Sequence, residues 1–265
     1  MKDKNMFDYS KNTDWKKFYS INQDHYHTIY HIDDLLRLWE KYKDEFMEEF
    51  PELDEETLIT AIKWHDSHYV PGDELNEVRS AENYINTVAD YISEMMESKD
   101  VDATIFTEFN PIVCLVIEST KIGYNFTDEL PAECKVMHDL DWAGFTDYKT
   151  FKNNCEKIYQ EVIDHNPFPK EDETFGQKVR RNQIEFYRKF AEKPLYLTKT
   201  FSKFNDIAKE NMLKLADELE NTYFSRRSAF DCTGMFQYMQ PQITIADEEK
   251  FYKVIEGLAS SDNMK

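Results

Sequence analysis

The chain has 265 residues, of which 41% are hydrophobic and 15% aromatic, so it can bury a sizeable core and is not expected to be disordered as a whole. Its 52 acidic and 32 basic residues give a formal charge of -20, which repels a phosphate polymer and argues against broad nucleic-acid binding. No two of the four cysteines form a C-x-x-C pair, which argues against zinc-finger and dithiol redox motifs.

The N-terminal segment has no apolar region typical of a secretion signal. The strongest apolar run, IVCLVI at 112–117, is too short to span a bilayer. We therefore expect a cytoplasmic protein with free thiols and no membrane partner. The few glycines and prolines, 6 and 8, predict long helices with few tight turns.

The first helix is predicted over 28–46, where apolar residues recur at helical spacing on one face and charged residues lie opposite. Pro51 follows and stops it. The second helix is predicted over 54–69, with Asp54 as its N-cap and acidic residues in its first turn. Pro71 and the glycine after it end this helix.

A third helix is predicted over 73–96, and its apolar stripe is expected to face inward: Val78, Ala81, Ile85, Val88 and Ile92. The next segment, 103–121, is apolar nearly all round and is expected to be central, with Pro111 starting its main part. Further helices are predicted over 147–163, 171–191 and 205–224.

The remaining tail, 225–265, mixes methionine and aromatic residues, and only QITIA, 242–246, has the character of a strand. Because helical periodicity runs nearly throughout, we predict an all-α fold with one domain over 1–224 and a C-terminal extension over 225–265. The extension is expected either to pack on the domain or to serve assembly, for example of a homo-oligomer.

Three of the seven histidines fall in one short segment, QDHYHTIYHID. His27 and His31 are four residues apart and would share one helix face, so one can bind a metal while the other reaches a substrate beside it. His25 points elsewhere and is treated as incidental. The simpler alternative is a solvated helix start, where histidine is common.

The pair His65–Asp66 follows an apolar helix face, ITAIKW. Adjacent helical side chains diverge by about 100°, so both can hold one ion only at the inner edge of the helix. A buried His–Asp pair needs a partner, which a metal supplies, whereas a mutual hydrogen bond needs no metal. Farther on, HDLDWAG offers Asp139 and Asp141 beside core residues, with an acidic helix N-terminus as the alternative.

The order of these pieces resembles the HD superfamily of metal-dependent phosphohydrolases. YHTIYHI resembles the Y-H-x-x-x-H-I that opens a bacterial and phage branch of predicted HD phosphohydrolases, and WHDSHY resembles its W-x-H-D-x-x-Y. NEVRSAENY resembles its N-E-x-x-S-A, DLDWAG its D-L-x-x-x-G, and IAKENMLKLADEL its A-R-x-N element. The resemblance covers roughly residues 20–220 and implies an HD-domain-like helical bundle.

Carried over residue by residue, the resemblance implies a divalent metal held by His31, His65, Asp66 and Asp139. Asp139 fits the D-L-x-x-x-G spacing, and Asp141 is the alternative. The opening segment is also similar to that of cyclic-nucleotide phosphodiesterases, which makes His27 the candidate general acid. Glu77, in the N-E-x-x-S-A piece, is implied as a carboxylate that supports the ligands or orients water.

The chain also departs from this branch. Gly123 stands where the branch has the histidine of T-x-x-H, which argues against a second metal and leaves Lys121 as a candidate phosphate contact. Val70 replaces the last acid of H-D-x-x-Y-D. His68 stands at an apolar position of the branch, so it is expected beside the ligands or on the surface.

Other side chains are candidates for binding substrate. An arginine can hold a phosphate with two hydrogen bonds, and the candidate arginines are Arg79, Arg180 and Arg181. For the first two, an ion pair at the surface or between packed helices is the favoured alternative. Tyr69 and Tyr124 are aromatic candidates for stacking on a base.

Two imidazoles and two carboxylates without sulfur suit Mn, Fe, Mg, Co or Ni, and Zn can also bind. In the implied chemistry a metal-activated water attacks phosphorus, Asp66 accepts its proton and His27 protonates the leaving oxygen. The expected substrate is a small phosphate ester, in particular a nucleotide mono- or diester. A catalytically weak metal- or nucleotide-binding HD module is the second hypothesis, and a helical interaction protein without a site is the third.

Overall fold

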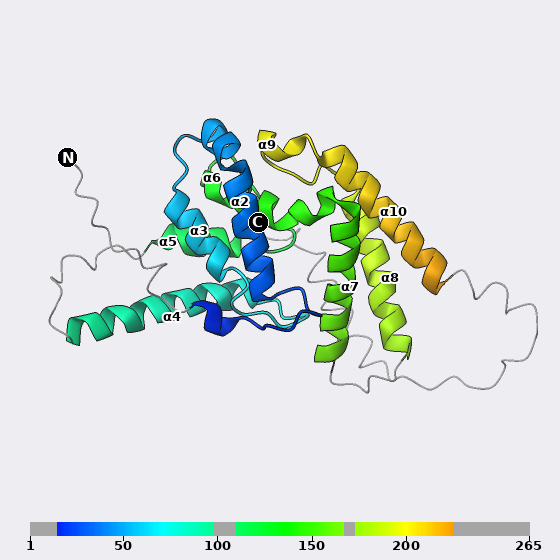
Figure 1. Ribbon diagram of the computed structural model, residues 1–265, viewed down its shortest axis with the longest axis horizontal. Coiled ribbons are helices and arrows are strands. Elements are labelled where there is room, and N and C mark those ends of the chain that lie inside the picture. The colour runs from blue at the N-terminus through cyan, green and yellow to red at the C-terminus, as the bar shows by residue number, and fades with distance from the viewer. Residues whose placement is uncertain (1–14, 98–109, 167–172, 225–265) are drawn as a thin grey trace, which may run out of the picture. The chain divides into compact units, whose positions relative to one another are not determined.

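The structure is a computed structural model and describes residues 15–97, 110–166 and 173–224 (Figure 1). Within these ranges all regular secondary structure is helical, apart from one isolated β-bridge, which confirms the predicted all-α class. None of the helices in this part of the chain is sufficiently long and apolar to cross a membrane. The strand predicted at 242–246 and the extension 225–265 lie outside the described residues.

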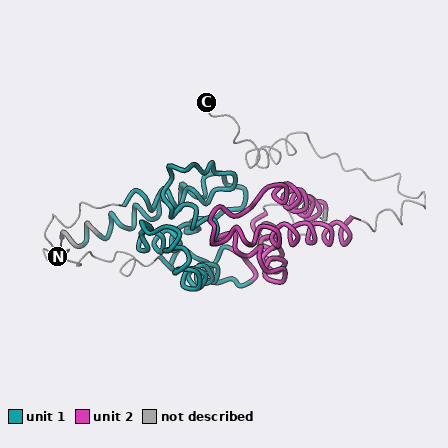
Figure 2. The backbone as a smooth tube through the Cα atoms, turned by 90° about the horizontal axis from the view of Figure 1, so that it is seen from above, with its two compact units in different colours: residues 1–23, 27–140 teal, residues 24–26, 141–265 magenta. Residues whose placement is uncertain are grey.

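The chain divides into two compact units, residues 1–23 with 27–140 and residues 24–26 with 141–265 (Figure 2). This division falls inside the single domain predicted over 1–224. It lies just before Asp141, which is the last residue of helix α6, so the rest of that helix belongs to the first unit. The chain leaves the first unit for the three residues 24–26 and then returns to it.

The described helices of the first unit are η1 (Trp15–Phe18), α2 (Ile29–Glu49), α3 (Glu55–Trp64), α4 (Asn76–Glu97), α5 (Pro111–Glu118) and α6 (Ala132–Asp141). The predicted apolar stripe of α2 is largely buried, with Ile32, Leu35 and Trp39 nearly inaccessible to water. Pro111 begins α5, as predicted, and the Asn110 side chain caps that helix.

Helix α3 begins as predicted but ends early. The Asp54 carboxylate accepts the backbone N–H of Glu56 and so caps the start of the helix. The helix ends at Trp64, whereas the sequence predicts helix as far as 69. Beyond Trp64 the backbone is bonded by side chains of α4: the Ser80 hydroxyl accepts the His68 N–H, and Asn83 donates to the Ser67 carbonyl.

Helix α4 presents a different face from the one predicted. Ala81 and Val88 are buried as expected, but Val78 and Ile85 are 41% and 37% exposed. The buried face of α4 is rotated relative to the predicted stripe. It includes the fully buried Ser80, whose hydroxyl bonds the backbone of His68 in the turn after α3. The apolar stripe alone could not predict this rotation, since the polar residue faces the core to satisfy backbone groups.

The described helices of the second unit are η3 (Trp142–Thr146), α7 (Tyr148–His165), α8 (Glu173–Phe190), α9 (Lys199–Ser202) and α10 (Asn205–Tyr223). The three long helices match the predicted ranges to within a few residues. Aromatic rings fill the core of this unit, with Trp142 stacked on Phe145, Phe186 and Phe190. The sequence prediction missed α6 in the first unit and the short α9 in the second.

Candidate metal centre

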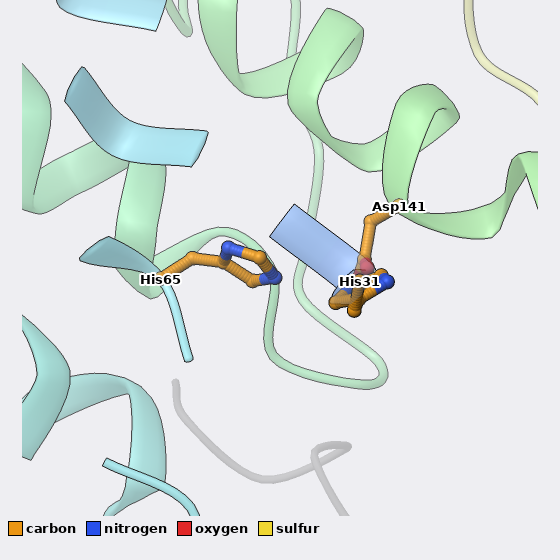
Figure 3. A group of neighbouring side chains, drawn as sticks. All are labelled: His31, His65 and Asp141. Carbon is orange, nitrogen blue, oxygen red and sulfur yellow. The ribbon is translucent and has the colours of Figure 1, made fainter. Parts of the chain in front are cut away.

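Three side chains of the metal-ligating type come together at the ends of helices (Figure 3). His31 lies in the first turn of α2, His65 directly follows α3, and Asp141 is the last residue of α6. Their ligand atoms all lie within 4.8 Å of one another. The two histidines are buried and Asp141 is half-buried. Figure 3 shows the His65 ring pointing toward the other two side chains.

Asp66 joins this group through both histidines. Its Oδ2 atom lies 3.0 Å from His65 Nε2 and 3.7 Å from His31 Nε2. In a continuing helix, neighbouring side chains would diverge by about 100°. Because α3 ends at Trp64, the Asp66 carboxylate can instead turn back toward the His65 ring. The predicted ligands His31, His65 and Asp66 are therefore brought together.

The hydrogen bonding of His65 sets the chemistry of its other nitrogen. Nδ1 lies 3.0 Å from the carbonyl oxygen of Ile62, which can only accept, so Nδ1 carries a hydrogen. In the neutral ring, Nε2 then points its lone pair at an Asp66 oxygen 3.0 Å away. Two such acceptors repel each other unless a proton or a metal ion lies between them.

The negative charge of Asp66 also favours a proton or a metal ion between its carboxylate and His65 Nε2. Burial alone raises the pKa of this carboxyl, but positive charge on His65, His27 and His31 outweighs it and holds the pKa well below its usual range. Asp66 is therefore ionised, which is the state that a carboxylate needs to bind a metal. A divalent cation at this point would supply the positive charge without requiring charged histidines.

The acidic side chain that comes together with His31 and His65 is that of Asp141, and not that of Asp139, which the spacing favours. Asp139 is fully buried but does not belong to the group found among the described residues. Two residues on a helix are about 200° apart, so Asp139 and Asp141 face nearly opposite sides of α6. Asp141 is also the N-cap residue of η3, so it lies at a helix N-terminus as the alternative supposes, but its side chain makes no capping hydrogen bond there.

His27, the predicted acid, does not lie on a helix. Thr28 is the N-cap of α2, so the shared helix face expected for His27 and His31 is absent. Its ring instead stacks on Tyr69, with ring centroids 3.3 Å apart and planes inclined by 18°. The His27 charge still lowers the pKa of Asp66, which keeps His27 at the candidate centre. Tyr69, predicted to stack on a base, has one ring face covered by His27.

Glu77, the second residue of α4, is half-buried beside the candidate centre. Burial raises the pKa of its carboxyl, the positive charge of Lys121 opposes that rise, and the charge of Asp66 adds to it. This coupling to Asp66 and Lys121 is consistent with a carboxylate next to the ligands. Lys121 itself is exposed, and its Nζ donates to the Glu74 carbonyl at 3.2 Å.

The predicted substrate contacts Arg79 and Tyr124 have other neighbours. Arg79 donates to Asp73 at 2.5 Å and lies 3.3 Å from the His68 ring nitrogen, an exposed network that matches the surface alternative. The ring of Tyr124 packs on that of Phe126, with centroids 5.2 Å apart.

Arg180 is a packing residue in the second unit. It is buried, bonds the Glu156 carboxylate and lies 3.6 Å from the ring centroid of Tyr159. This is the helix-packing ion pair that was the favoured alternative. Arg181 lies over the ring of Phe224 at 5.2 Å.

His25 is more than incidental. Its Nε2 atom lies 3.1 Å from an Asp164 oxygen, and its Nδ1 atom lies 4.0 Å from a Glu161 oxygen. Both acids belong to α7, so His25 attaches segment 24–26 to that helix. Nothing in the local sequence pattern indicates this contact, because its partners are more than 130 residues away.

Comparisons with protein-family models, with curated proteins and with solved structures find no match.

Proposed function

We propose that the chain is a metal-dependent phosphohydrolase that cleaves a small phosphate ester, in particular a nucleotide mono- or diester. The observation that carries the proposal is the convergence of His31, His65 and Asp141 within 4.8 Å, with Asp66 against both imidazoles. Two nitrogens and two carboxylates form a donor set without sulfur, which suits Mn, Fe, Mg, Co or Ni, and Zn can also bind.

The fit to a divalent ion rests on His65. Its Nδ1–H is committed to the Ile62 carbonyl, which leaves Nε2 as the ligand atom, as in most metal-binding histidines. His31, His65, Asp66 and Asp141 would hold the ion. When bound, a divalent ion neutralises phosphate charge and lowers the pKa of water.

The chain's own residues supply the proton transfers. The resemblance makes Asp66 the candidate acceptor of the water's proton, and a metal ion that lowers the pKa of the water would offset the weak basicity that the low pKa of Asp66 implies. His27, stacked on Tyr69, is the candidate donor of a proton to the leaving oxygen. Glu77 lies where its carboxyl interacts with both Asp66 and Lys121, which suits a role in orienting water or supporting the ligands.

A nucleotide is the preferred substrate class for two reasons. The chain resembles the HD superfamily, which often acts on nucleotides, and this argument is one of analogy. In addition, Tyr69 lies beside His27 with one ring face already stacked, so a base could extend the stack from the other face. The acidic chain, at -20, disfavours a polymeric nucleic acid as the substrate.

A binding module with little turnover is the second candidate. Gly123 stands where the resemblance leads one to expect a histidine, and its φ of 81° lies in the left-handed region. A histidine would be strained in that conformation, so this backbone favours glycine. A centre with one metal and weak catalysis is consistent with that difference.

The test measures metal content and hydrolysis of a panel of mono-, di- and triphosphates, cyclic nucleotides and an aryl phosphodiester. Asp66→Ala is compared with the wild type, and Asp90→Ala, an exposed acid on α4, is the matched control. We expect metal and turnover in the wild type and the control and loss of turnover in Asp66→Ala. Metal without turnover would favour the binding module, and absence of metal would refute both.

A further inference from the structure

The segment that precedes the candidate centre touches two of the helices that build it. Ser20 and Thr28 form a parallel β-bridge, and the Ile29 N–H donates to the Ser20 carbonyl at 3.3 Å. This bridge lies at the start of α2, beside His27 and shortly before His31. One residue earlier, the Tyr19 hydroxyl donates to the Lys63 carbonyl at 3.0 Å, near the end of α3.

The same segment is packed firmly within the first unit. Trp15 and Tyr19 are 7% and 8% exposed, and their rings meet edge to face with centroids 5.8 Å apart. The Phe18 ring lies 5.3 Å from that of Trp64, the last residue of α3. Because its ring is fixed by this packing, the Tyr19 hydroxyl cannot readily move to another hydrogen-bond partner.

The Tyr19 hydroxyl lies at the end of α3, next to the turn that contains the candidate ligands His65 and Asp66. Burial raises the pKa of this phenol well above its usual value, the negative charge of Asp66 raises it further, and a hydrogen bond with the Asp66 backbone lowers it. The hydroxyl therefore meets both the last turn of α3, through Lys63, and the residue that carries the ligand carboxylate.

We propose that Tyr19 is a positioning residue that holds the turn containing His65 and Asp66 in the geometry needed to bind a metal. Metal ligands are oriented by the groups that hydrogen-bond to them or to their backbone, and loss of such a group commonly weakens metal binding. The simpler alternative is that Tyr19 only fills the core. The proposal rests on the metal centre inferred above, so its test includes a measurement that needs no metal.

Tyr19→Phe removes the hydroxyl and keeps the ring. Tyr187→Phe is the matched control, because Tyr187 is also buried and its hydroxyl contacts the Cys155 thiol in the second unit. The first measurement is Co²⁺ affinity together with the visible spectrum of the bound ion, which reports ligand geometry. We expect Tyr19→Phe to weaken Co²⁺ binding about tenfold and to change the spectrum. Tyr187→Phe is expected to stay within about twofold of the wild type.

The second measurement is amide hydrogen exchange without metal. We expect exchange at residues 64–67 to become about fivefold faster in Tyr19→Phe, with no change in the middle of α4. Unchanged exchange, or unchanged Co²⁺ affinity and spectrum, would overturn the proposal. If the wild type itself bound no Co²⁺, the proposed function would fail, and exchange at 64–67 would still decide whether Tyr19 holds the turn.

Discussion

At the candidate centre, the hydrogen bond that one ring nitrogen of a histidine makes determines whether the other nitrogen is available to bind a metal. His65 gives its Nδ1–H to the Ile62 carbonyl and so directs Nε2 at Asp66. The resemblance implied His31, His65 and Asp66, because the H-x-x-x-H spacing and the adjacent H-D that carry it can be read in the sequence. The D-L-x-x-x-G spacing favoured Asp139 over Asp141, whereas the geometry brings Asp141 to the histidines, because the choice depends on the rotation of α6 about its axis.

Substitution of the two acids on α6 tests that choice. If Asp141 is the ligand, Asp141→Asn is expected to weaken Mn²⁺ binding by at least about tenfold, because it removes the carboxylate charge. Asp139→Asn is expected to leave Mn²⁺ affinity unchanged while costing about 1–3 kcal/mol of stability, because Asp139 is fully buried. Calorimetric titration with Mn²⁺ and urea unfolding measure the two quantities. The reverse pattern of affinities would make Asp139 the ligand.

The buried thiol of Cys134 provides a prediction away from the metal. Burial raises its pKa to about 11, so the reactive thiolate is populated only at strongly alkaline pH. At pH 8, about three pH units lower, roughly 0.1% of the thiol is ionised. We expect iodoacetamide to label Cys134 at least about a hundredfold more slowly in the native protein than in urea, as followed by peptide mass spectrometry. Equal rates would show that the thiol is accessible and ionised.

Among the secondary-structure elements, the end of α3 positions two of the candidate ligands, His65 and Asp66. The sequence predicted the start of this helix from Asp54 but not its end at Trp64, because the groups that stop it come from α4. Ser80 accepts from the His68 N–H and donates to the His68 carbonyl. A helix that continued to 69, as the periodicity predicts, would separate His65 from Asp66.

Substitution of two serines on α4 tests whether Ser80 stabilises the turn after α3. Ser80→Ala leaves backbone groups of the turn without their partner and is expected to cost about 2 kcal/mol in urea unfolding. Ser93→Ala, on the exposed part of the same helix, removes only a bond to the Ala89 carbonyl and is expected to change stability by less than about 0.5 kcal/mol. Equal losses would assign the effect to helix propensity and not to the turn.

On the scale of the whole molecule, the division into two units could not be predicted from local patterns. The boundary at Asp141 falls where α6 passes directly into η3, without the glycine- or proline-rich linker that usually marks a domain boundary. Segment 24–26 joins the second unit through His25 and two acids of α7, a long-range contact that sequence spacing does not reveal. The class of the fold, by contrast, follows from periodicity that each helix carries by itself.

The net charge of -20 leads to a prediction about salt. Like charges repel one another in the compact state more than in the unfolded chain, and salt screens that repulsion. Exposed ion pairs such as Lys152–Glu218 oppose the trend, because salt weakens them, but each contributes only about 0–1 kcal/mol. We therefore expect the midpoint of thermal unfolding to rise by several degrees between 20 and 300 mM (roughly a fourfold reduction in screening length).

Sodium chloride and choline chloride, compared in the presence of a chelator, separate this screening from binding of a particular cation. Screening depends on ionic strength, so both salts are expected to raise the midpoint equally. A rise with sodium alone would indicate a specific site. A fall with both salts would mean that ion pairs, such as those of Arg188 with Asp217 and Glu220, outweigh the repulsion of the acidic surface.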